Sequence, residues 1–360
     1  MRKFYFTPGP SQLYFTVESH MNEALKKHIP SISHRSAAFE QIYRHAADGV
    51  RALLGLKNNY HVLFVSSATE IWERIGQNLV GNESFHFVNG AFSDRFHNTI
   101  EQLGKNALKD EVAAGKVVNV DKVLIPESVE LIAFTQNETS TGAQQPLEDI
   151  YKVRKAFKNQ LIAVDMVSAA PITELDYSQV DTAYFSVQKC FGLPAGLGVW
   201  IVNDRCISKC EHLLNRGHSI GSYHSLPVMR EKAAKHQTPE TPNVLNIYLL
   251  GKVVEDMLNK GLDKIRKETL YKSAVLYQAF EDCSYLSPFV KEEAYRSKTT
   301  PVAVTEMDST KIIEAFDRKG LVIGSGYGKF KKEHIRIANF PTHSKEQIEM
   351  IADLLHALKF

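Results

Sequence analysis

A single lysine lies among apolar and small residues in the stretch TAYFSVQKCFGLPAGLGVW, residues 182–200. The segments on both sides of Lys189 have the composition of buried strands, and lysine is rarely buried without a partner. An amine in apolar surroundings has a lowered pKa, which makes it a nucleophile toward carbonyl groups. Lys189 is therefore our first candidate for a chemical role; the alternative is a lysine that extends its ammonium group to solvent.

Further candidates share one position, because each comes just after a stretch that reads as a strand. They are Asp165 at the end of LIAVD, Thr139 after LIAFTQNE, Phe92 after FHFVNGA, and Ala68 and Thr69 after HVLFVSS. In α/β sheets, ligands bind outside the carboxyl ends of the strands. Taken singly, each residue also has a structural explanation. Asp165 fits a strand-end cap, Thr139 a polar turn and Phe92 a core aromatic, while Ala68 and Thr69 fit the start of a capped helix.

Pyridoxal phosphate is a ligand that suits this set of groups. At one edge of the sheet it would meet an amine, a carboxylate, a hydroxyl, an aromatic ring and a helix N-terminus. Its aldehyde condenses with a lysine, and its pyridine nitrogen needs an acidic partner to stay protonated. Its phosphate suits the free N–H groups of a helix N-terminus. The ring suits an aromatic cover, and the phenolic oxygen suits a hydroxyl donor. The combination therefore predicts a pyridoxal-phosphate site, although each residue alone is weak support.

The elements that must position these residues are apolar strands separated by helical stretches such as PLEDIYKVRKAFKNQ. This alternation predicts an α/β sheet covered on both faces. A Gly/Pro loop joins TAYFSVQ to GVWIVN, which favours an antiparallel hairpin there. After about residue 244 a long helical region precedes further strands and helices, and this change predicts a smaller α+β domain. GSGYGKF, residues 324–330, precedes a strand, so we expect a hairpin there and not a phosphate loop.

Composition narrows the class of protein. With 360 residues, 44% of them hydrophobic, the chain can bury a large core, and its net charge of +2 gives no argument for nucleic-acid binding. No apolar run reaches the roughly 18 residues of a membrane span, and we read no targeting segment at the start. Cys206, Cys210 and His212 lie close in CISKCEH, but no fourth ligand is near, so we predict no metal site. Four cysteines imply no disulfide framework and favour a cytoplasmic protein.

From TPGP at residues 7–10 to IRIANF at residues 335–340, the chain resembles the fold type I, class V aminotransferases, and most of all those that act on phosphoserine. The resemblance implies a large cofactor-binding domain, residues 16–255, around a mixed, mostly parallel seven-stranded sheet. Residues 1–15 together with 256–360 would form the small α+β domain. By the same resemblance, Lys189 bonds to the cofactor, Asp165 pairs with its ring nitrogen, Phe92 stacks on the ring, and Thr139 contacts the phenolic oxygen.

The phosphate contacts also follow from the resemblance. Ala68, Thr69 and Gln188 would hold the cofactor phosphate, and Thr241, in TPETPN, would reach it from the other subunit. The resemblance thus implies a homodimer with shared sites. Glu240 stands where asparagine is frequent in these enzymes.

For the substrate, the resemblance assigns Arg336 to the α-carboxylate and His34 and Arg35, in SISHRS, to a distal phosphate. Arginine suits a carboxylate because its planar guanidinium binds it with two parallel N–H groups. SSATE, residues 66–70, lacks an arginine that some of these enzymes carry there, and Lys329 and Lys331 stay open as further cations. The implied reaction moves an amino group from glutamate to 3-phosphohydroxypyruvate, giving phosphoserine and 2-oxoglutarate.

Three alternatives stay open at this point. Serine– or alanine–glyoxylate aminotransferases share most of these motifs but need no distal phosphate pocket, so His34 and Arg35 discriminate. A cysteine desulfurase needs a mobile nucleophilic cysteine, whereas Cys190 simply follows Lys189. A cofactor-carrying protein without turnover is the third, and it would fail to respond to amino donors.

Overall fold

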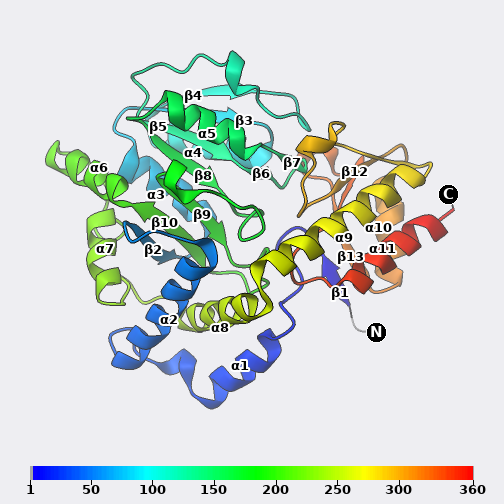
Figure 1. Ribbon diagram of the computed structural model, residues 1–360, viewed down its shortest axis with the longest axis horizontal. Helices are drawn as coiled ribbons and strands as arrows, with labels where there is room; N and C mark the ends of the chain where they lie inside the picture. The colour runs from blue at the N-terminus through cyan, green and yellow to red at the C-terminus, as the bar shows by residue number, and fades with distance from the viewer. Residues whose placement is uncertain (1–2, 360) are drawn as a thin grey trace.

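The computed structural model describes residues 3–359, which form a larger and a smaller sheet lying side by side (Figure 1). The larger sheet has seven strands, in the spatial order β2 (Tyr60–Val65), β10 (Gly198–Asn203), β9 (Thr182–Ser186), β8 (Leu161–Asp165), β5 (Leu131–Thr135), β3 (Glu83–Val88) and β4 (Asn106–Glu111). β10 is antiparallel to both of its neighbours, and the other pairs are parallel. The predicted mixed, mostly parallel sheet and the predicted β9–β10 hairpin are therefore confirmed.

Strands buried on both faces have continuous apolar sequences, which is why the predicted strands were found. Every residue of β5, β8, β9 and β10 is buried. The sequence NALKDE gave no such signal, and β4 was missed. It lies at the sheet edge, where charged side chains are common because they discourage pairing with another chain.

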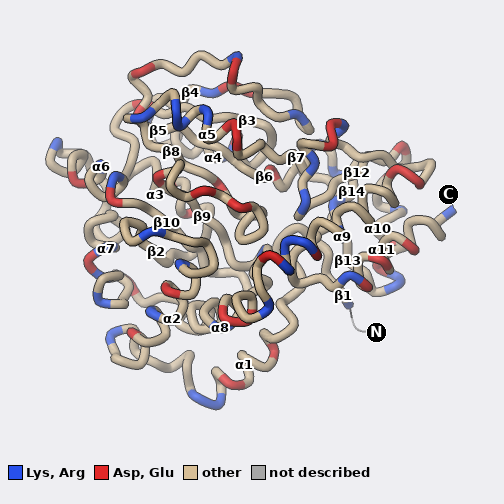
Figure 2. Tube along the Cα trace, viewed as in Figure 1, with Lys and Arg blue, Asp and Glu red and all other residues tan. Residues whose placement is uncertain are grey.

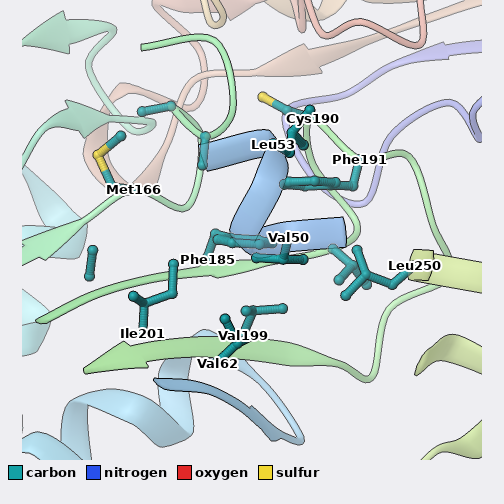
Figure 3. Close-up of a cluster of buried hydrophobic side chains, with 14 of the residues drawn as sticks. Val50, Leu53, Val62, Met166, Phe185, Cys190, Phe191, Val199, Ile201 and Leu250 are labelled. Atoms are coloured by element: carbon teal, nitrogen blue, oxygen red, sulfur yellow. The ribbon is translucent and has the colours of Figure 1, made fainter. Parts of the chain in front are cut away.

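Helices cover both faces of the larger sheet, as predicted. One face carries α3 (Ala68–Leu79), α4 (Ala91–Gln102), α6 (Asp204–Asn215) and α7 (Leu226–Ala234). The other carries α2 (Ala37–Leu54), α5 (Leu147–Ala156) and α8 (Val244–Lys260), with α1 (Val17–Lys26) packed on α8. Figure 3 shows part of the second layer, in which Val50 and Leu53 of α2 lie near Phe185 and Phe191.

The smaller sheet has the order β1 (Phe4–Phe6), β13 (Leu321–Ser325), β14 (His334–Arg336), β12 (Val302–Thr305) and β11 (Leu286–Pro288). β1 runs parallel to β13, so the start of the chain joins a sheet made otherwise from its last third. The sheet lies beside α9 (Leu262–Asp282), α10 (Ser309–Arg318) and α11 (Lys345–Ala357). A capping box formed by Ser344 and Gln347 starts α11.

Two details depart from the predicted elements. The long helical region after residue 244 is two helices, because Gly261, at a φ of +86°, ends α8 before α9 begins. A short hairpin of β6 (Asn137–Glu138) and β7 (Ala143–Gln144) follows β5. Basic and acidic residues are interspersed along the chain in both parts of the molecule (Figure 2). Across residues 3–359, none of the helices combines the length and apolarity needed to cross a bilayer.

Candidate active site

Lys189 lies just beyond β9, at the carboxyl edge of the larger sheet. Its side chain is buried, and its Nζ donates a hydrogen bond of 2.6 Å to the carbonyl oxygen of Pro8. Burial and, to a smaller extent, the neighbouring Arg336 lower the pKa of Lys189 to about 8, while Asp165 opposes the shift. Nζ also lies 5.6 Å from the centre of the Phe92 ring. A neutral, nucleophilic amine is therefore accessible close to neutral pH.

Gly9 explains why the TPGP segment can approach this lysine so closely. A Cβ at residue 9 would lie 2.4 Å from Cε of Lys189, and the backbone φ there is +113°. Only glycine adopts that conformation without strain and leaves the space free. The N-terminal segment therefore forms one wall of the site.

Asp165, the last residue of β8, is the carboxylate nearest to this lysine in the predicted set. It is 4% exposed and accepts a hydrogen bond of 2.8 Å from the N–H of Val167. Burial raises the pKa of Asp165 to about 7. Nε1 of Trp72 donates to the Tyr184 hydroxyl, which stands beside the carboxyl group. Few groups around this buried carboxyl stabilise its ionised form. The positive charge on the protonated ring nitrogen of pyridoxal phosphate would stabilise the carboxylate, so the site fits this cofactor.

Phe92 is held in place by a buried acid that the sequence did not reveal. The Glu138 carboxylate accepts hydrogen bonds from the N–H groups of Phe92, at 3.1 Å, and Ser93, at 2.9 Å. It thereby caps the N-terminus of α4, where negative charge is favourable. A Cβ at residue 90 would lie 2.4 Å from Cγ of Glu138. The glycine at this position, in the motif NGAFS, is therefore the sequence feature that could have indicated the contact.

Thr139 is oriented by polar groups from both parts of the molecule. Its hydroxyl donates to Oγ of Ser168 at 2.7 Å. The Thr299 hydroxyl, from the segment before β12, donates to the backbone carbonyl of Ser168 at 2.5 Å. The predicted donor to the phenolic oxygen thus lies on a buried network, and Ser168 and Thr299 were not among the predicted residues.

Arg336, the last residue of β14, is a half-buried cation. Its Nε donates to the Ser325 carbonyl at 2.7 Å, and its Nη1 donates to the Thr139 carbonyl at 3.2 Å. Within residues 3–359 no carboxylate lies at ion-pair distance from it, and burial lowers its pKa to about 10. A partly buried charge without a counter-charge is costly, so the guanidinium fits an incoming carboxylate.

Tyr327 is a further residue at the substrate end that the sequence did not single out. Its ring lies 5.1 Å from that of Phe92 and 5.5 Å from the guanidinium carbon of Arg336. It belongs to GSGYGKF, which forms the predicted hairpin connection between β13 and β14. Lys329 and Lys331 in and beside this motif are exposed.

The N-terminus of α3 lies at the same edge as Lys189. The N–H of Ala68 donates to Oγ of Ser186, the last residue of β9, at 2.8 Å. Ser67 caps the helix, whereas the Glu70 side chain binds Ser66 and does not complete a reciprocal capping box. Thr69 is exposed and Gln188 is half-buried. This helix start fits a phosphate group.

Arg35, with His34 beside it, has its contacts in a different segment, the loop of residues 237–241. Arg35 donates to the carbonyl oxygens of Thr238, at 2.7 Å, and Pro239, at 2.9 Å, in the loop that leads to Thr241. His34 beside it has a pKa lowered by burial and by Arg35. In the described part of the chain, no hydrogen bond or ion pair joins His34, Arg35 or Thr241 to Lys189, Asp165 or Arg336. In addition to the cofactor group around Lys189, Arg35 and the loop of residues 237–241 therefore form a second group, defined by their own contacts.

The cysteines take no part in either group. Burial raises the pKa of the Cys190 thiol to about 12, which disfavours the thiolate that a desulfurase needs. Cys206 and Cys210 are buried on α6, and Cys210 donates to Oδ1 of Asn78. Among the residues described, no three His, Cys, Asp or Glu side chains gather as metal ligands would.

Comparison with known proteins agrees with this geometry. The pattern described as Aminotransferase class-V matches residues 3–329. A solved phosphoserine aminotransferase from Cytophaga hutchinsonii is 50% identical, with a TM-score of 0.97, and the match covers 99% of this chain and 98% of that one. A putative phosphoserine aminotransferase from Mycolicibacterium vanbaalenii is 29% identical over 89% of this chain and 86% of its own. An alanine–glyoxylate aminotransferase from Nostoc sp. shares the fold, at 21% identity and a TM-score of 0.85 over 99% and 95% of the two chains. This chain therefore belongs to the class V aminotransferases, which depend on pyridoxal phosphate.

Proposed function

We propose that this protein moves an amino group from glutamate to 3-phosphohydroxypyruvate, forming phosphoserine and 2-oxoglutarate. The observation that carries the proposal is the 50% identity over 99% of the chain to the solved phosphoserine aminotransferase. The glyoxylate alternative has weaker support, because that resemblance, at 21% identity, concerns the fold alone.

Each residue of the cofactor group has a proposed task in this reaction. Pyridoxal phosphate, when bound, supplies an electron-withdrawing ring conjugated to the substrate amine. Nζ of Lys189 takes the proton from Cα of the amino acid and later returns one to the keto acid's carbon. Asp165 holds a proton on the ring nitrogen, and Thr139 binds the phenolic oxygen. Burial of Lys189 keeps water away from this transfer.

Substrate recognition is divided between two ends of the pocket. Arg336 binds the α-carboxylate that every amino acid and keto acid substrate carries. Phe92 covers the cofactor ring, while Ala68, Thr69 and Gln188 hold its phosphate. His34 and Arg35 bind the distal phosphate that distinguishes phosphoserine from serine and alanine.

The second group serves the neighbouring subunit in this proposal. The protein is a cytoplasmic homodimer in which Thr241 reaches the partner's cofactor phosphate, and His34 and Arg35 reach the partner's substrate. Residues 16–255 form the large domain, and residues 1–15 with 256–360 form the small one. Arg35 is hydrogen-bonded to the loop that leads to Thr241, so the two proposed contacts would reach the partner together, which supports this arrangement.

Substrate preference tests the chemical proposal. Wild-type protein should transaminate phosphoserine with 2-oxoglutarate faster than serine or alanine with glyoxylate. Arg35→Ala should raise KM for phosphoserine about tenfold to a hundredfold, which is the value of a charge-assisted contact, with a much smaller effect on glutamate. Equal rates with both substrate classes, unchanged by Arg35→Ala, would favour the glyoxylate alternative.

Mixed dimers test the shared site separately. Refolding Lys189→Ala subunits with Arg35→Ala subunits places both defects in one site of the mixed dimer and leaves the other intact. Phosphoserine activity should then rise to about a quarter of the wild-type value, because half of the dimers are mixed and each has one whole site. No recovery in dimers shown to be mixed would mean that Arg35 serves the site of its own subunit.

A further inference from the structure

A buried histidine joins the start of α3 to the loop that carries Thr241. His224, directly before the N-cap of α7, is 4% exposed. Its Nδ1 lies 2.5 Å from Oε1 of Glu70, and its Nε2 lies 3.3 Å from Oε2 of Glu240. Neither contact has the alignment of a good hydrogen bond, so the Glu70–His224–Glu240 cluster is held mainly by charge.

Each carboxylate of this cluster lies next to a segment proposed to hold the cofactor phosphate. Glu70 is in the first turn of α3, and its side chain accepts a hydrogen bond of 3.0 Å from the N–H of Ser66. Glu240 directly precedes Thr241 in the sequence. A carboxylate close to a phosphate dianion repels it unless a cation offsets its charge.

The two carboxylates differ in how they are compensated. Glu70 also lies 3.5 Å from Nε of Arg74. Glu240 has an ion pair only with His224 in the part of the chain that the structure describes. The other titratable groups near Glu240 are His34 and the buried Tyr43 phenol, while Tyr223 packs against the His224 ring at 4.1 Å. Loss of the imidazolium charge would therefore leave Glu240 uncompensated.

We propose that His224 is a positioning residue for the cofactor phosphates of both subunits. As an imidazolium it neutralises Glu240, next to the Thr241 that is proposed to reach the partner's phosphate, and it fixes this loop to the start of α3, which is proposed to hold the phosphate of its own subunit. This rests on the proposed placement of the phosphate at Ala68 and Thr69. Arg35 holds the other side of the same loop through Thr238 and Pro239.

The charge state of His224 agrees with this role. Burial lowers the pKa of His224, but Glu240 and Glu70 outweigh burial and raise it to about 9. Because the pKa is raised, the stabilisation of the fold by the charged His224 is complete below the ordinary histidine pKa of about 6.5. It is lost as pH rises through about 9. The effect on the phosphate should therefore appear in mildly alkaline solution.

The test compares binding of pyridoxal phosphate and of pyridoxal, which lacks the phosphate, to the cofactor-free dimer. His224→Gln should weaken pyridoxal phosphate binding about tenfold or more at pH 7.5 and leave pyridoxal binding unchanged. His218→Gln, in the same loop, is the matched control and should change neither. Adding Glu240→Gln to His224→Gln should restore phosphate-dependent binding, because the uncompensated carboxylate is gone.

The pH dependence supplies a second readout. The preference of the wild type for pyridoxal phosphate over pyridoxal should fall as pH rises through about 9, and it should stay level in the double variant. Equal loss of both ligands in His224→Gln, or no rescue by Glu240→Gln, would overturn the proposal and leave His224 a packing residue. Binding is measured without any amino acid, so these outcomes do not depend on whether phosphoserine is the substrate.

Discussion

Arg336 allows a substitution whose effect can be worked out from its contacts. Nε and one N–H of Nη1 are used by backbone carbonyls, so the remaining N–H groups of Nη1 and Nη2 can face a carboxylate. With a pKa of about 10, the guanidinium is charged at neutral pH. Two charge-assisted hydrogen bonds, at about 1.5–3 kcal/mol each, are therefore available to the substrate.

Arg336→Lys keeps the charge but removes the planar pair of donors. Loss of one hydrogen bond should lower kcat/KM about tenfold to 150-fold, and Arg336→Met, which loses both, should lower it by about 150-fold or more. Steady-state kinetics with glutamate, 2-oxoglutarate and phosphoserine should show the same factor, because each carries an α-carboxylate. Arg318→Lys, an exposed arginine on α10, is the control. A loss confined to phosphoserine would refute the assignment and move Arg336 to the distal phosphate.

Three further predictions concern the cofactor end. Borohydride reduction of the loaded protein should attach the cofactor at Lys189, and Lys189→Ala should abolish this attachment; a label on another lysine in the peptide map would contradict the site. In the cofactor-free protein, the Asp165 pKa of about 7 exceeds its unfolded value of about 3.9, so folding stability should fall by about 4 kcal/mol as pH rises from about 4 to 7. Asp165→Asn should remove this part of the slope in denaturant melts, and identical slopes would contradict the burial argument. Gly9→Ala should weaken cofactor binding and slow turnover, since its Cβ would meet the Lys189 side chain at 2.4 Å; wild-type kinetics would show that the segment moves freely.

The sequence predicted the sheet well because its strands are buried on both faces and read as continuous apolar runs. NALKDE failed this criterion, since an exposed edge strand has no such run. The prediction of one continuous helical region after residue 244 was wrong. Its hydrophobic pattern continues past Gly261, and only the positive backbone angle there separates α8 from α9.

The rule that ligands bind at the carboxyl ends of strands located the residues that end or directly follow a strand in the sequence, including Lys189 and Asp165. It could not locate groups that act through contacts between distant segments, because no spacing in the sequence encodes them. The residues missed for this reason are Glu138, Ser168, His224, Thr299 and Tyr327. The roles of the predicted residues in catalysis stay predictions for the experiments above.

The N-terminal segment that contacts Lys189 has a consequence for how the protein is made. The Pro8 carbonyl and Lys189 are 181 residues apart, Thr139 and Arg336 are 197 apart, and β1 pairs with β13, which starts at Leu321. Contacts between such distant segments form slowly, because a long loop must close before they stabilise anything. On the ribosome, the first strand therefore waits for most of the chain to emerge. A nascent chain that ends between Lys189 and β13 has no neighbouring strand for β1 and no Arg336, so the pocket is completed only after β14 has been synthesised.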